Sequence, residues 1–70
     1  MKKIKVEIDT AYIKLDQLLK FLSLASSGAE AKMIILDGEV KVNEDICFTR
    51  GKKIYPGDKI EVFSNVYEVE

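Results

Sequence analysis

The chain has no histidine and no tryptophan, and its 70 residues include a single cysteine and a single proline. Without histidine, a glycine-rich phosphate loop or a cluster of metal-ligand side chains, the common forms of acid–base, nucleotide and metal catalysis have no residues to support them. Cys47 cannot form an internal disulfide and has no base to activate it, so we expect a strand residue and not a nucleophile. The sequence therefore predicts a protein that is not an enzyme and uses no cofactor or metal.

Long apolar runs are also missing. No segment approaches the roughly 20 apolar residues of a membrane span, and the N-terminus alternates from Lys3 to Ile8 where a signal peptide would have an unbroken apolar core. With 47% hydrophobic and 33% charged residues, the chain is typical of a folded globular protein. We expect one small domain over residues 1–70, cytoplasmic, monomeric and with no membrane partner.

Hydrophobic spacing predicts a strand followed by two helices. Ile4, Val6 and Ile8 alternate as in a half-buried strand. A helix is predicted from near Ile13, with Thr10 as a possible cap and with an apolar stripe at i, i+3, i+4 and i+7: Leu15, Leu18, Leu19 and Leu22. A second helix is predicted from Ser27, which has capping-box spacing to Glu30. Its inner side carries Ala31, Ile34 and Ile35, and Gly38 is placed as its left-handed stop.

The second half of the chain is expected to be strands and turns. Val40 and Val42 begin a hairpin, with Ile46 and Phe48 beyond its turn. Tyr55-Pro56-Gly57-Asp58 suits a type II turn, because proline stands second and glycine third. Residues 60–63 and 66–69 then form a last hairpin around Ser64-Asn65.

Four short motifs occur in a characteristic order: Lys14-Leu15-Asp16, Ser26-Ser27-Gly28 with Ala31 after it, Gly38-Glu39-Val40-Lys41-Val42-Asn43, and Gly57-Asp58-Lys59-Ile60. This set resembles the ribosomal-protein S-four RNA-binding domain, also called the αL motif. Because such a domain fills the chain, the sequence is most similar to the small stand-alone bacterial members of that family.

The resemblance has two departures. The family's usual arginine after the serine is Gly28, which removes one expected phosphate contact. The glycine usual after the strand asparagine is Glu44, which disfavours a tight Asn-Gly hairpin. We therefore expect a longer or bulged turn through Glu44-Asp45.

We predict an α+β fold in which two packed helices lie against a small, curved, mostly antiparallel sheet extended by the N-terminal and C-terminal strands. The resemblance implies non-catalytic binding of structured RNA, either ribosomal or transfer RNA, through contacts to its backbone and shape. It also implies the ribosome or an assembly intermediate as the wider partner.

Several groups of residues could contact RNA. Lys14, Gln17 and Phe21 are neighbours on the first helix, about 100° or more from the leucine stripe. An aromatic ring beside a cation and an amide can stack on a base. Alternatively, Phe21 widens the apolar stripe.

Two further segments could contact phosphates. The free amides at Ser27 and Gly28 lie at the positive end of the second helix, which suits a phosphate or is an ordinary cap. Arg50-Gly51-Lys52-Lys53 is the densest cationic segment, and Arg50 can hold a phosphate bidentately. The predicted RNA-binding residues are Lys14, Gln17, Lys20, Ser27, Gly28, Lys32, Arg50, Lys52 and Lys53.

The net charge of −1 does not by itself favour a polyanionic partner. RNA binding therefore requires the cations to share one face, with the acidic residues elsewhere, and Asp16 is interpreted as a structural carboxylate. The alternative is a protein-interaction adaptor in ribosome assembly or translation that has lost strong RNA affinity. A β-grasp carrier of similar size would need a C-terminal Gly-Gly, whereas this chain ends in Val69-Glu70.

Overall fold

The computed structural model describes residues 2–70. Its elements are β1 (Lys2–Val6), β2 (Ile13–Lys14), α1 (Leu15–Phe21), α2 (Gly28–Leu36), β3 (Val40–Val42), β4 (Asp45–Ile46), β5 (Lys53–Ile54), β6 (Lys59–Val62) and β7 (Asn65–Val69). A five-stranded sheet has the order β1-β7-β6-β3-β4, and only β1 and β7 are parallel. The predicted α+β fold is thus confirmed, and so is the extension of the sheet by the two terminal strands.

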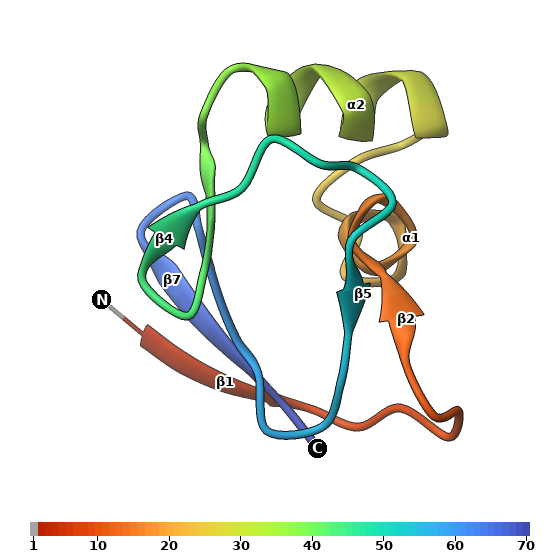
Figure 1. Cartoon of the computed structure of the whole chain (residues 1–70), viewed down its shortest axis with the longest axis vertical. Helices are drawn as coiled ribbons and strands as arrows, with labels where there is room; N and C mark the ends of the chain where they lie inside the picture. Colours follow the sequence, from red (N-terminus) through yellow and green to blue (C-terminus); the bar gives the residue numbers. More distant parts are fainter. Residues whose placement is uncertain (1) are drawn as a thin grey trace.

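The two helices pack on each other and enclose the core with the sheet. Figure 1 shows α2 across the top of the molecule and α1, seen end-on, below it, next to a separate two-stranded sheet of β2 and β5. Leu15, Leu18 and Leu19 of α1 are fully buried, as are Ala31 and Ile35 of α2. Each buried leucine contributes about 1.5–3 kcal/mol relative to an exposed one. Neither helix within residues 2–70 has the length and apolar character that crossing a lipid bilayer requires.

The first helix begins later than predicted. It starts at Leu15, because Ile13 and Lys14 form β2 and pair with Ile54 and Lys53 of β5. Thr10 does not cap the helix, since its hydroxyl donates to the Tyr12 carbonyl (2.8 Å). At Ile13 and Lys14, pairing with a strand far along the chain outweighs the helical pattern. The spacing of apolar residues within a short segment cannot reveal such a partner.

The turn between β3 and β4 is tighter than predicted. Val42 pairs with Asp45, so only Asn43 and Glu44 connect the strands, with φ of 50° and 79°. Positive φ at both positions defines a type I′ turn, and the prediction of a longer turn is wrong. The Asn43 side chain explains why: its Nδ2 donates to Asp58 Oδ1 (3.1 Å) and its Oδ1 accepts from the Lys59 amide (3.0 Å). These bonds hold the tight turn despite the left-handed Glu44.

The last hairpin turns one residue earlier than predicted. Val62 pairs with Asn65, which leaves Phe63 and Ser64 in the turn at φ of 52° and 66°. This register keeps Val62 on the buried face, because a one-residue shift would invert every side chain.

The predicted turn at residues 55–58 is confirmed. The Asp58 amide donates to the Tyr55 carbonyl (3.0 Å), and Gly57 has a φ of 102°. Cys47 was predicted to be a strand residue, but it comes directly after β4 and is half-buried. Its amide nevertheless continues the pairing with β3 by donating to the Val40 carbonyl (2.9 Å).

Candidate nucleic-acid interface

The loop that contains Arg50, Lys52 and Lys53 is attached to the N-terminus of α1. The Leu15 amide donates to the Lys52 carbonyl (2.9 Å), and the Asp16 amide donates to the Arg50 carbonyl (3.0 Å). The first amides of a helix have no backbone partner within the helix, and the side chain of the N-cap residue Lys14 makes no capping hydrogen bond. The loop therefore acts as the cap, and its backbone holds the cations beside α1.

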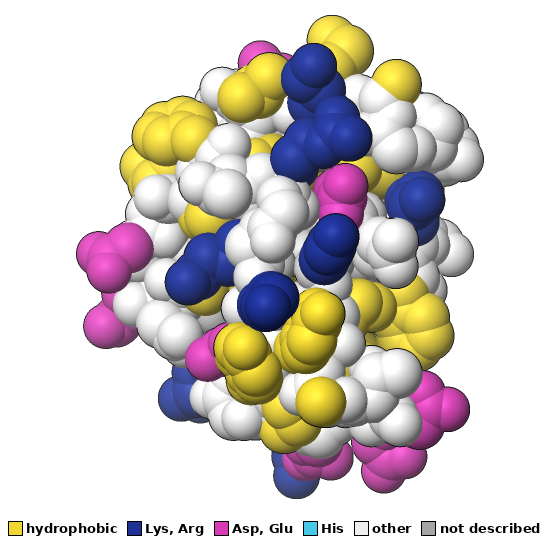
Figure 2. Space-filling view, turned by 45° about the vertical axis from the view of Figure 1, so that its right-hand side comes forward, with side chains coloured by type: hydrophobic (Ala, Val, Ile, Leu, Met, Phe, Trp, Pro, Cys, Tyr) yellow, Lys and Arg dark blue, Asp and Glu magenta, His cyan; other side chains and the backbone are white. Residues whose placement is uncertain are grey.

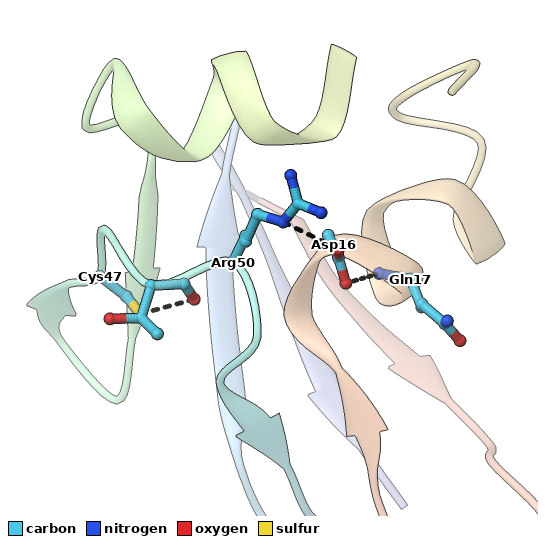
Figure 3. Close-up of polar contacts among 5 residues, drawn as sticks. Asp16, Gln17, Cys47 and Arg50 are labelled. Atoms are coloured by element: carbon cyan, nitrogen blue, oxygen red, sulfur yellow. Dashed lines mark hydrogen bonds and ion pairs between the residues drawn. The ribbon is translucent and has the colours of Figure 1, made fainter. Parts of the chain in front are cut away.

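Arg50 is oriented by Asp16 (Figure 3). Arg50 Nε lies 3.7 Å from Asp16 Oδ2, and the two side chains are 56% and 17% exposed. The other Asp16 oxygen accepts from the Gln17 amide (2.8 Å), so the predicted structural role of Asp16 is confirmed. Figure 3 shows the terminal guanidinium nitrogens above Asp16, on the side of α2, while the Gln17 side chain points away from Arg50. The outer edge of the guanidinium thus remains available to a phosphate.

The β2–β5 pairing places two lysines directly opposite each other. Lys14 and Lys53 are partners in the antiparallel ladder, and both are exposed. Directly opposite residues project from the same face, and like charges in this arrangement destabilise a sheet. Lys14 also stands at the N-cap of α1, where the helix dipole disfavours a cation. Folding alone would therefore not favour lysine at either place.

Two tyrosines that the sequence analysis missed accompany these lysines. The Lys53 ammonium lies 4.9 Å from the centre of the Tyr12 ring, and the Tyr12 and Tyr55 ring centres are 5.7 Å apart. The sequence did contain a signal for them. Each tyrosine is two residues from a lysine, and residues two apart in a strand lie on the same face. It could be used only once the pairing of Lys14 with Lys53 was known.

Phe21 is exposed, and the interpretation that it widens the buried stripe is wrong. Its side chain is 60% accessible. Together with Tyr12, Lys14 and Gln17 it lines a groove between α1 and residues 7–13. The structure therefore brings the predicted trio of Lys14, Gln17 and Phe21 to one concave surface.

The N-terminus of α2 is capped by its own residues. The Ser27 hydroxyl accepts from the Glu30 amide (3.1 Å), and the Glu30 carboxylate accepts from the Ser26 amide (3.0 Å) and hydroxyl (3.2 Å). The carboxylate thus reaches Ser26 and not the Ser27 amide that the capping-box pattern predicted. Gly28 follows in the first turn, where an added Cβ would meet no atom within 4 Å. A phosphate approaching Ser27 and Gly28 would share this end of α2 with the Glu30 carboxylate.

The remaining predicted cations, Lys20 and Lys32, are exposed on α1 and α2. Figure 2 shows Lys and Arg side chains in a band down the face that carries α1, β2 and β5, with most acidic side chains toward its margins. Within residues 2–70 the ion pairs are Arg50–Asp16 and Lys5–Glu70. The predicted lysines are not neutralised by such pairs: Lys14, Lys20, Lys32, Lys52 and Lys53. In the same part of the chain, no group of His, Cys, Asp or Glu side chains could hold a metal ion.

The fold and this cationic face are those of a small α+β RNA-binding domain, and comparison with known proteins agrees. Residues 6–70 match the S4 domain family, which is the S-four family of the resemblance. The chain is also 40% identical over 57 residues to the probable ribosome maturation protein RlbA of Bacillus subtilis (strain 168), covering 81% of this chain and 80% of that protein. The chain therefore belongs to the S4 domain family.

Proposed function

We propose that this protein binds structured RNA without catalysing a reaction, and that its RNA is ribosomal RNA in a maturing ribosomal particle. The supporting observation is the exposed pair of Lys14 and Lys53, two directly opposed cations that form no ion pair with an acidic side chain of residues 2–70. Similarity to a probable ribosome maturation protein favours this RNA over transfer RNA.

Binding would proceed mainly through the phosphate backbone. Arg50 offers donors held by Asp16, and the lysines of the β2–β5 ladder offer point charges at a fixed spacing. Neither contact depends on the identity of a base, so specificity would come from the shape of the folded RNA.

The first test is crosslinking of RNA to the protein in cells, followed by sequencing, with affinity for the recovered RNA measured in vitro. Replacing exposed Lys52 and Lys53 by glutamate should lower affinity at least tenfold, about 1.4 kcal/mol. Lys2→Glu with Lys3→Glu is the matched control, because these exposed lysines lie on β1, an edge strand of the five-stranded sheet, whereas Lys53 lies in the two-stranded sheet. From about three to five phosphate contacts, the log–log salt slope should be about −2 to −4. Equal affinity of the two double variants would contradict the proposal.

A second candidate function is a protein-interaction adaptor. It is favoured by exposed apolar side chains on and beyond the strand hairpins: Ile46 is 51% exposed, Phe48 58% and Phe63 48%. A flat salt response, with co-purification of a protein and no crosslinked RNA, would support the adaptor over the RNA-binding function.

A further inference from the structure

The groove between α1 and residues 7–13 has two exposed aromatic side chains in its lining. Phe21 lies on α1 and is 60% exposed, and Tyr12 lies just before β2 and is 37% exposed. Gln17 is one helical turn before Phe21 and therefore on the same side of α1. The groove thus offers flat apolar surfaces together with an amide that can both donate and accept hydrogen bonds.

The charges around this groove differ between its parts. Glu7 and Asp9 belong to its lining, as does Lys14, and Lys53 stands opposite Lys14 in the β2–β5 ladder. The carboxylates repel a phosphate but accept hydrogen bonds from the amino groups of a nucleobase. The lysines attract the phosphates. A nucleotide therefore fits this surface with its base in the groove and its backbone over the lysines.

We propose that this groove binds one unpaired nucleobase of the RNA by stacking against Phe21, beside Tyr12, while Lys14 and Lys53 hold the adjacent phosphates. This inference rests on the proposed function. A base within a duplex is already stacked and paired, so the ligand is a bulged or loop nucleotide that extends from a helical RNA. Stacking on aromatic rings is tolerant of sequence, because every base has a π-face.

The test compares two labelled RNA hairpins that differ only in a single bulged adenosine, by fluorescence anisotropy. The protein should bind the bulged hairpin at least fivefold more tightly than the fully paired one. Phe21→Leu should reduce this preference to less than twofold. Leucine is a good helix former and keeps an apolar side chain at this exposed position, but it has no ring to stack.

A second measurement locates the contact directly. After ultraviolet crosslinking in cells and trypsin digestion, nucleotide adducts should occur on the peptides 6–14 and 21–32, which contain Tyr12 and Phe21 respectively. Adducts confined to other peptides would overturn the inference.

The outcomes separate this inference from the proposed function. Equal affinity for the two hairpins, or a full preference retained by Phe21→Leu, overturns the base-binding groove, while salt-sensitive binding of the paired hairpin leaves the proposed function intact. If neither hairpin binds at low salt and no RNA is crosslinked in cells, the proposed function fails and the inference fails with it.

Discussion

Lys14→Glu should make the protein more stable and weaken its RNA binding. Lys14 faces Lys53 across the β2–β5 ladder and stands at the N-cap of α1. Glutamate would replace a repulsive cross-strand pair by an attractive one, and such pairs contribute about 0.2–1 kcal/mol. It would also place a negative charge at the positive end of α1, for a further 0.3–1 kcal/mol or so at low ionic strength.

Both sites are exposed, so the gain in the free energy of unfolding should be about 0.5–1.5 kcal/mol. For a domain of this size, 1 kcal/mol corresponds to a Tm change of about 4–8 °C. Thermal unfolding followed by circular dichroism should therefore show a Tm increase of about 2–12 °C in low salt. The increase should shrink in 1 M salt, where the Debye length falls to about 3 Å.

RNA affinity should fall at least fivefold in the same variant, about 1 kcal/mol, and the salt slope should decrease by about 0.9 for the lost phosphate contact. Lys3→Glu is the control, because it makes the same charge change on β1, where its neighbour in β7 is the uncharged Val66. It should change stability by no more than about 0.5 kcal/mol and leave RNA affinity within twofold. A less stable Lys14→Glu protein, or one with full RNA affinity, would refute the reasoning.

Other positions give independent tests. Glu44→Gly should raise the free energy of unfolding by about 1 kcal/mol in urea titrations, because Glu44 has a φ of 79°, and Glu44→Ala should show no such gain. At Gly28 an added Cβ would meet no atom within 4 Å, and Gly28→Arg would introduce the arginine that is usual in the family. This variant should strengthen RNA binding several-fold at low salt. An equal gain from Gly28→Gln would show that the added charge is not responsible. Ala31→Leu should cost about 1–3 kcal/mol, since Ala31 is fully buried at the helix contact, and unchanged melting would contradict that packing.

The sequence predicted those parts of the fold that depend on local spacing. The leucine stripe of α1, the start of α2 at Ser27 and the Pro-Gly turn follow from periods and turn chemistry within a few residues. It did not predict β2 and β5, because each has two residues and is defined only by the other. The type I′ turn at Glu44 was missed for a related reason, since its support comes from Asp58 and Lys59, far along the chain.

The candidate site shows the same division. The basic residues could be named from composition and motif order, but their arrangement could not. The pairing of Lys14 with Lys53 decides that Tyr12 and Tyr55 lie together beside a cation. The exposure of Phe21 depends on where α1 ends and on which residues cover its other side, and a helical wheel contains neither fact.

An overall charge of −1 is compatible with RNA binding because of distance and screening. The molecule measures 25 × 25 × 19 Å, and the Debye length is about 8 Å at physiological ionic strength. Acidic side chains on the far side therefore lie more than two Debye lengths from a phosphate at Lys14. Near this lysine, only Glu7 and Asp9 of the groove oppose the cations. At about 0.01 M salt the Debye length reaches 30 Å and exceeds the molecule, so the acidic residues oppose binding. The log–log plot of affinity against salt should then flatten at low salt. A plot that stays straight down to 0.01 M would mean that the effect of the acidic residues does not depend on screening. They would then be either too close to the RNA or too few.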